Sequence, residues 1–227
     1  NNSDTLNIQA GLLTLNNAIE FNDQFGVAGD VIELEISEFN ADAGEINIFN
    51  NGDLTIPDPD LDGDGNPETW LEVADDNSDN TTSVPGSGNP EIGAVGVRAR
   101  TGDITISVGS NALFIEGVIM ARTDATNPDP LITSAVPVPG ADIKLVAGGL
   151  EIEASIIAGG YDTVNSDPGN ITIEPGSISS PVYIGTDPTD PSSSGLRLTQ
   201  RELNFLRTDQ MATIQIGVDG GSGDVTI

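Results

Sequence analysis

A five-residue phrase recurs along the chain: a glycine, an acidic or amide residue, then an aliphatic, a polar and a second aliphatic residue. Clear copies stand at residues 44–48, 52–56, 102–106, 169–173 and 223–227, and looser copies stand at 29–34 and 140–145. Glycine permits the positive φ of a tight turn, and aliphatic residues two positions apart point to the same side of a strand. Each copy therefore predicts a turn followed by a short strand with one apolar face.

The other apolar runs also read as strands. They stand at residues 5–15, 94–100, 112–121, 150–158 and 212–217. The stretch 199–207 differs from these runs and reads as a helix. Thr199 followed by Glu202 has the spacing of a helix capping box, and Leu203 and Leu206 would fall on one helical face. The pattern predicts an all-β protein with one short helix near 199–207, to which we assign no chemical role.

The core composition selects among the possible β architectures. Sandwich cores draw on large aromatic residues, which make up only 4% of this chain. Small aliphatic residues after repeated turns favour a parallel β-helix, in which each coil stacks on the next about 4.8 Å away. The copies are irregularly spaced, which two insertions rich in Pro, Asp, Asn and Ser would explain, at 57–91 and 122–140. A hydrophobic content of 37% suits a single domain over 1–227.

Charge narrows the functional class. Seven Lys and Arg against 36 Asp and Glu give a formal charge of -29, which repels nucleic acid phosphates and anionic lipid headgroups and attracts cations. The chain has no cysteine or histidine, which excludes thiol nucleophiles, Ser-His-Asp triads, disulfides and nearly all zinc chemistry. The chemistry still available to the chain is that of carboxylates and of metal ions bound by oxygen ligands.

Localisation follows from composition and from the absence of a long apolar run. No run approaches the roughly 20 residues that span a bilayer, so we expect no direct membrane insertion. The first residues lack a methionine, a basic region and an apolar core of a signal peptide, which suggests a processed or excised piece. Cytoplasmic halophile proteins share the acidity but have a lower hydrophobic content. We expect a secreted or cell-surface protein.

The stretch 183–227 resembles the repeat of filamentous-haemagglutinin-type large secreted exoproteins. The matching residues are Ile184-Gly185, Gly195-Leu196, Leu198, Glu202-Leu203, Leu206, Thr213-Ile214, Ile216-Gly217 and Gly223 to Ile227. Outside this stretch only the style of the glycine phrases is shared. The resemblance implies a right-handed parallel β-helix, export by two-partner secretion and a role in adhesion to a host or matrix glycan or protein.

The segment "DPDLDGDGNPET" is the densest group of oxygen ligands in the chain. Alternating carboxylates can point inward around an ion, while Gly63 and Gly65 allow the necessary turn. The predicted ligands are Asp58, Asp60, Asp62, Asp64, Asn66 and Glu68. Hard oxygen ligands select Ca²⁺, although this is no EF-hand, because position 12 counted from Asp60 is Leu71. A solvated acidic loop is the alternative, and a second acidic group at Asp75, Asp76 and Asp79 is the fallback.

Enzymatic activity is the main functional alternative. Parallel β-helices include polysaccharide lyases, which use Ca²⁺ and a basic residue, and Arg98 and Arg100 share one face of a predicted strand. A glycosidase with paired carboxylates is a further alternative, but 36 acidic residues guarantee some suitable pair in any case, so their number is no evidence for it. The strong negative charge opposes a polyanionic substrate, so we expect both arginines to neutralise nearby carboxylates and the chain to be no enzyme.

The expected function is therefore a calcium-stabilised structural or adhesive segment of an extracellular fibre protein. The chain is in strand pattern from Thr5 and stops on Ile227, the last residue of a complete phrase. Terminal coils of a solenoid leave backbone groups unpaired. We expect further coils of the same chain to cover them or, if the chain is a filament subunit, neighbouring copies stacked head to tail.

Overall fold

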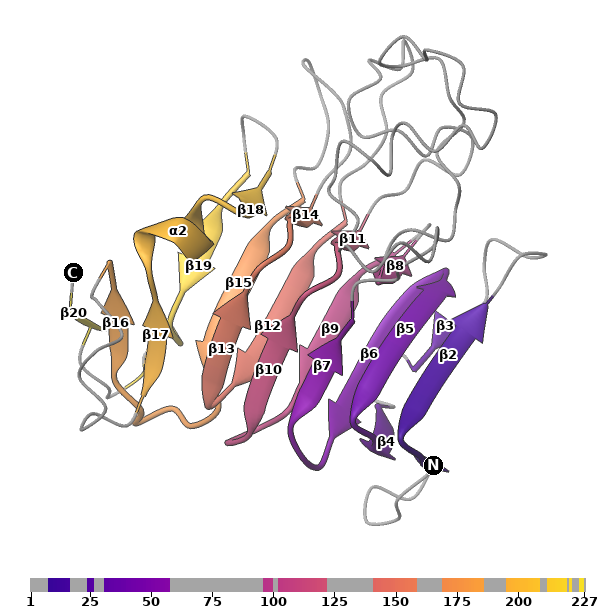
Figure 1. Ribbon diagram of the computed structural model, residues 1–227. Coiled ribbons are helices and arrows are strands. Elements are labelled where there is room, and N and C mark those ends of the chain that lie inside the picture. The colour runs from indigo at the N-terminus through magenta and orange to yellow at the C-terminus, as the bar shows by residue number, and fades with distance from the viewer. Residues whose placement is uncertain are drawn as a thin grey trace, which may run out of the picture.

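The computed structural model describes residues 8–16, 24–26, 31–57, 96–99, 102–121, 141–158, 169–185, 195–208, 212–219, 221 and 225–226. These residues form long parallel sheets in a stacked, solenoid-like register (Figure 1). Every strand pair among them is parallel. The described part contains one helix, α2 (Gln200–Leu203), so the expectation of an all-β protein is confirmed.

The first sheet contains most of the glycine phrases. Its order is β1 (Ile8–Gln9), β4 (Ile32–Glu35), β6 (Glu45–Asn50), β9 (Ile104–Ser107), β12 (Ile143–Ala147), β15 (Ile171–Pro175) and β19 (Ile214–Ile216), with β3 (Gln24–Phe25) also paired to β6. The strand register places isoleucines from successive coils in one row, namely Ile46, Ile104, Ile143, Ile171 and Ile214. The alternation of apolar and polar residues thus fixes the register despite unequal lengths of chain between coils.

The second sheet has two halves joined by β5 (Glu38–Ala43), on which β2 (Leu12–Asn16) also stacks. One half contains β7 (Leu54–Ile56), β10 (Ala112–Ile115) and β13 (Gly149–Ile152). The other contains β8 (Val97–Ala99), β11 (Ile119–Ala121), β14 (Ile156–Ala158) and β18 (Leu206–Arg207). The start of β5 pairs with β7 and its end with β8, so each complete coil contributes a strand to the first sheet and to each half of the second.

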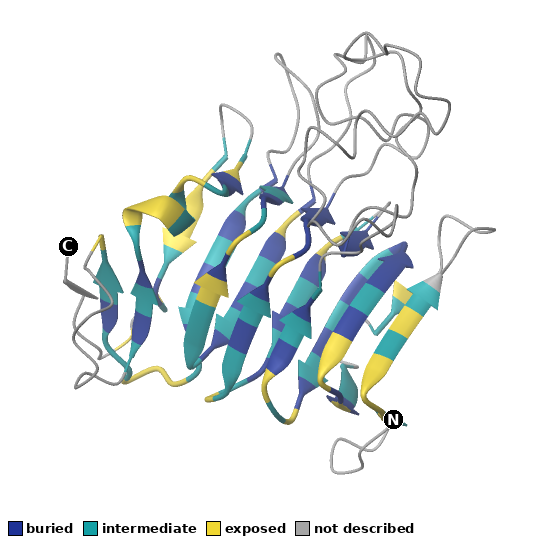
Figure 2. Ribbon diagram, viewed as in Figure 1, coloured by how far each residue is buried: buried dark blue, intermediate teal, exposed yellow. Residues whose placement is uncertain are grey.

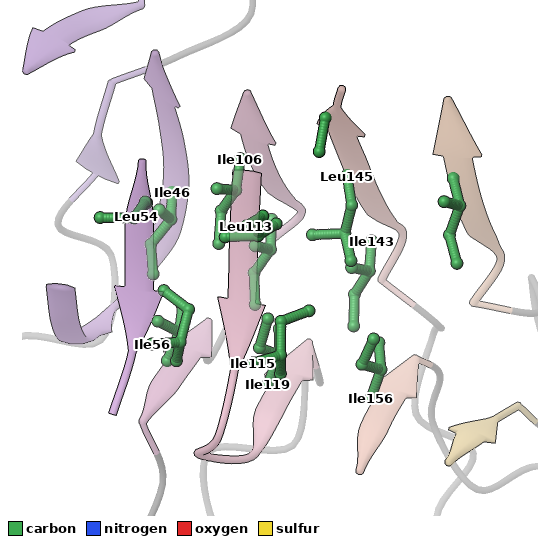
Figure 3. Close-up of a cluster of buried hydrophobic side chains, with 14 of the residues drawn as sticks. Ile46, Leu54, Ile56, Ile106, Leu113, Ile115, Ile119, Ile143, Leu145 and Ile156 are labelled. Carbon is green, nitrogen blue, oxygen red and sulfur yellow. The ribbon is translucent and has the colours of Figure 1, made fainter. Parts of the chain in front are cut away.

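The core lies between these strands and consists of aliphatic side chains in rows. Figure 3 shows isoleucines and leucines from the facing strands, among them Ile46, Leu113 and Ile143, pointing toward one another. The central strands alternate buried and half-buried positions (Figure 2). Each fully buried Ile or Leu contributes about 1.5–3 kcal/mol relative to an exposed one. Repeated burial of aliphatic side chains therefore supplies most of the core, and Phe39 is the fully buried aromatic side chain among the described residues.

Two corner glycines allow successive coils to approach closely. A Cβ atom on Gly148 would overlap the carbonyl oxygen of Ser110, and one on Gly176 would overlap the carbonyl oxygen of Gly109. Both glycine amides donate hydrogen bonds to the preceding coil, at 2.9 Å from Gly148 to Asn111 and 2.8 Å from Gly176 to Ala147. Only a residue without a side chain fits between the coils at these corners.

The last coils depart from the simple winding order. A third sheet has the order β17 (Leu196–Leu198), β16 (Val182–Ile184) and β20 (Val225–Thr226). β17 contacts β13 without pairing with it, and β16 lies on the far side of β17 (Figure 1). The strand that comes first in the sequence thus lies farther from the preceding coil.

Strands occur in every predicted run that the structure describes, but the runs at 5–15, 112–121 and 150–158 each divide into two strands separated by a corner. The helix is shorter than expected. It ends at Leu203, and Leu206 belongs to β18, where its side chain is 8% exposed. The shared helical face predicted for Leu203 and Leu206 is therefore wrong. Pairing of β18 with β14 gives Leu206 a place in the core that a longer helix would not. The insertion at 122–140, and that at 57–91 apart from Pro57, lie outside the described residues.

Candidate functional site

The predicted calcium ligands lie outside the described part of the chain. They are Asp58, Asp60, Asp62, Asp64, Asn66 and Glu68, and the fallback group of Asp75, Asp76 and Asp79 lies there as well. Among the described residues, no group of three or more acidic side chains could hold a metal ion. Calcium binding by residues 58–68 therefore stays a prediction.

Arg98, one of the two arginines considered for a lyase, is placed by the structure, whereas Arg100 is outside the described residues. Its neighbours Val97 and Ala99 point into the core, so Arg98 points away from it, yet Arg98 is only 5% exposed. The strand register sets it beside Asp42, which is 9% exposed. Buried charges require compensation, so adjacent opposite charges favour a structural role for Arg98.

A row of side chains along one corner connects successive coils of the first sheet. We call Asp103, Asp142 and Asn170 the corner row. Asp103 Oδ1 accepts a hydrogen bond of 2.9 Å from the Asp142 amide, and Asp142 Oδ1 accepts one of 2.8 Å from the Asn170 amide. Asn170 Nδ2 donates to the same Asp142 oxygen at 3.0 Å, and Asn170 Oδ1 accepts from the Thr213 amide at 2.9 Å. Each side chain thus binds the backbone of the next coil.

The same arrangement occurs in the second sheet. Asp53 precedes β7, and its Oδ1 accepts a hydrogen bond of 2.9 Å from the amide of Ala112, which opens β10. The second residue of the glycine phrase is thus an inter-coil acceptor in both sheets. The acidic or amide acceptor is visible in the sequence before most phrase strands. The backbone amide that it binds could not be identified from the sequence, because that amide lies 28 to 59 positions later in the chain.

A buried asparagine secures the corner between β6 and β7. Asn50 is 0% exposed; its Oδ1 accepts from the Ile36 amide at 2.9 Å, and its Nδ2 donates to the Ile36 carbonyl at 3.0 Å. Nδ2 also lies 3.1 Å from the Gly52 carbonyl oxygen and 3.3 Å from that of Asp53. One side chain thereby binds the backbone of two neighbouring coils, and it leaves no buried polar group of its own unsatisfied.

Glu202 joins the helix to the edge of β13. Its Oε2 accepts hydrogen bonds from the Thr199 amide at 2.7 Å and the Thr199 hydroxyl at 2.8 Å, which confirms the capping box. Its Oε1 accepts from the Ile152 amide at 3.2 Å. This second contact occurs at the edge of β13 that has no paired strand among the described residues. The carboxylate therefore caps α2 and also bridges two coils.

The gap between β13 and β17 is a cleft of about 550 Å³. It is lined by Leu150, Glu151, Ile152, Glu153, Arg197 and Arg201, together with the helix cap and two glycines. The Arg197 guanidinium carbon lies 4.9 Å from the centre of the Tyr183 ring, a cation–π distance. We call this the β13–β17 cleft. Its charges are mixed, and with no histidine or cysteine in the chain it offers no imidazole base or thiol nucleophile.

Exposed apolar residues mark the two ends of the stack. In the described part, the large hydrophobic residues that are exposed are Leu12 at 51%, Ile178 at 58% and Ile214 at 42%. Leu12 is on β2 near the N-terminal end of the stack, and Ile214 is on β19, the last strand of the first sheet. A cavity of about 320 Å³ at the C-terminal end is lined by Ile178, Val182 and Ile216. Ile214 is thus exposed in a row that is buried on the inner coils, whereas Leu12 lies on the outward face of β2 with its exposed pairing partner Glu38.

The comparisons with known proteins add no identification. No family model, no curated protein and no solved structure matches the chain. In the described part of the chain, no helix is long and apolar enough to cross a membrane.

Proposed function

We propose that this chain is a segment of a secreted, right-handed parallel β-helix that serves as a non-catalytic structural or adhesive part of an extracellular fibre. The observation that carries the proposal is the change in burial along one row of the first sheet. Ile46, Ile104, Ile143 and Ile171 are 0% exposed, whereas Ile214 at the end of the same row is 42% exposed. Among the described residues, no strand beyond β19 covers Ile214, whereas the inner members of the row have a strand on both sides.

The N-terminal end has the same character. Leu13 and Leu15 of β2 are only half-buried, although their pairing partners Phe39 and Ala41 are 0% and 3% exposed. An end coil also presents strand N–H and C=O groups without a partner, which is a template for another parallel strand. Both ends therefore suit coverage by further coils of the same polypeptide or by a neighbouring copy stacked head to tail.

Calcium belongs to the proposal because of the charge. A formal charge of -29 opposes contact between copies unless cations reduce the repulsion. Residues 58–68 supply the oxygen ligands for such a cation. We therefore propose that Ca²⁺ stabilises the segment and promotes stacking of its ends.

The lyase alternative receives little support from the described residues. Arg98 is 5% exposed and lies beside Asp42, so it offers a polymeric substrate almost no accessible surface. The acidic side chains of the β13–β17 cleft include Glu202, whose oxygens already bind Thr199 and Ile152. A structural or adhesive role uses these residues as they are arranged.

The test is assembly at defined Ca²⁺ concentrations, followed by sedimentation and electron microscopy. The end variant is Ile214→Asp, and the matched control is Gln215→Asp, which adds the same charge to the same exposed strand but points outward. We expect Ca²⁺ to promote end-to-end assembly of the parent chain and of the control, and the end variant to remain monomeric. A parent chain that stays monomeric at every calcium concentration, and whose native reading frame ends at Ile227, would contradict the proposal.

A further inference from the structure

The corner between β6 and β7 contains a chemically reactive pair, Asn51 and Gly52. It is the only Asn-Gly pair in the chain. Asn51 is exposed, and neither its carboxamide nor the Gly52 amide makes a hydrogen bond to the described residues. The Asn51 amide itself is held by the Leu34 carbonyl at 2.7 Å. The side chain is thus open to solvent while the residue stays at a fixed place in the corner.

We propose that Asn51 is a site of spontaneous conversion to isoaspartate in the folded protein. The deprotonated Gly52 nitrogen attacks Cγ of Asn51 and forms a C–N bond, the bond to the side-chain nitrogen breaks, and ammonia leaves. The product is a five-membered succinimide. Water then opens this ring at either carbonyl, giving aspartate or, with the main chain rerouted through Cβ and Cγ, isoaspartate. Glycine favours the first step because it has no side chain to shield its nitrogen.

The position of this pair determines what the modification does to the fold. Isoaspartate inserts one additional carbon atom into the main chain just before Gly52. The carbonyl groups of Gly52 and Asp53 are the ones bound by buried Asn50, and Asp53 Oδ1 holds the Ala112 amide of the next coil. Lengthening the chain here displaces these groups, so the modification loosens the contact between β7 and β10. It is a slow, irreversible ageing step at a coil junction.

The first experiment measures modification in the folded chain. The protein is incubated at neutral and mildly alkaline pH, digested and analysed by peptide mass spectrometry with isoaspartate-specific enzymatic methylation. We expect Asn51 to be modified before exposed Asn204, which precedes Phe205, and the rate to rise with pH because the attacking nitrogen must lose its proton. If Asn51 survives intact in the folded chain while the same peptide reacts in the denatured chain, the proposal is overturned.

The second experiment tests the structural consequence. Hydrogen exchange at the Ala112 amide is compared in fresh protein, in aged protein and in the variant Asn51→Asp. This variant carries the charge of the modified residue without lengthening the main chain. We expect faster exchange at Ala112 only in the aged protein. Equal protection of the Ala112 amide in all three samples would overturn the proposed loosening of the contact between β7 and β10. Gly52→Ala is unsuitable as a control, because the Gly52 φ of +156° is rarely adopted by residues with a side chain.

Discussion

Asp142 and Asn170 stand immediately before strands β12 and β15 on successive coils, and one carboxylate oxygen of Asp142 accepts two hydrogen bonds from Asn170, one from its backbone amide and one from its side chain. This contact explains why the residue just before these strands is acidic or an amide, whether it follows the phrase glycine directly, as Asn170 does, or stands two positions after it, as Asp142 does. The acceptor is required by the backbone of the next coil as well as by the local turn.

Removing this acceptor should weaken the stack. We expect Asp142→Ala to lower the free energy of unfolding by about 1–3 kcal/mol, because the Asn170 amide loses a charge-assisted hydrogen bond. Asp142→Asn keeps an acceptor and should cost less. The control Glu116→Ala removes the same charge from an exposed position. Urea unfolding measures all three, and equal stability of Asp142→Ala and Glu116→Ala would contradict this account of the corner row.

The corner glycines provide a second, closely matched pair. Gly148→Ala should destabilise the protein by about 1–3 kcal/mol, because its Cβ meets the Ser110 backbone and the coils must move apart. Gly149→Ala should be nearly neutral, since a Cβ there lies 3.8 Å from the Ala112 Cβ, an ordinary contact. Thermal unfolding of the two variants distinguishes a packing requirement at one position from a general preference for glycine in this turn.

Glu202 should protect the β13 edge. Glu202→Ala removes the acceptors of Thr199 and of the Ile152 amide together, whereas Thr199→Ala removes the cap and leaves the contact to Ile152. Loss of a helix cap typically costs about 0.5–2 kcal/mol. We expect both variants to be less stable but only Glu202→Ala to speed hydrogen exchange at Ile152. Faster exchange in Thr199→Ala as well would mean that the helix as a whole, rather than this carboxylate, covers the edge.

Calcium should raise the melting temperature through residues 58–68. A ligand that binds only the folded state stabilises it by RT ln(1 + [L]/Kd), so millimolar Ca²⁺ should raise the midpoint and a chelator should lower it. The triple variant with Asp60, Asp62 and Asp64 changed to Asn should lose most of that difference, while the same three substitutions at Asp75, Asp76 and Asp79 should retain it. The reverse pattern would place the ion at the second acidic group.

The sequence predicts the strands well because apolar alternation is a local property. It predicts their placement less well, because the phrases at 52–56 and 102–106 follow the same pattern yet lie in different sheets. The burial of Arg98 and the strand conformation of Leu206 could not be predicted from the sequence either. Both depend on the neighbouring coil, since β8 pairs with β11 and β18 pairs with β14. The partners of the corner row could not be assigned without knowing how much chain separates successive coils.

The order of β16 and β17 has a consequence for how the molecule is built. From β4 to β15, each strand pairs with a strand that precedes it in the sequence, so this part of the stack can grow from the N-terminal side as the chain is synthesised. β16 cannot join the stack in this order. Its neighbour on the side of the finished coils is β17, which is synthesised later, so β16 must wait unpaired until β17 has been placed against β13. β16 and β17 share the same aliphatic spacing, with Val182 and Ile184 matching Leu196 and Leu198. During folding, β16 and β17 can therefore compete for the position beside β13. If β16 occupied that position before β17 was synthesised, β17 could not take its native place in the stack.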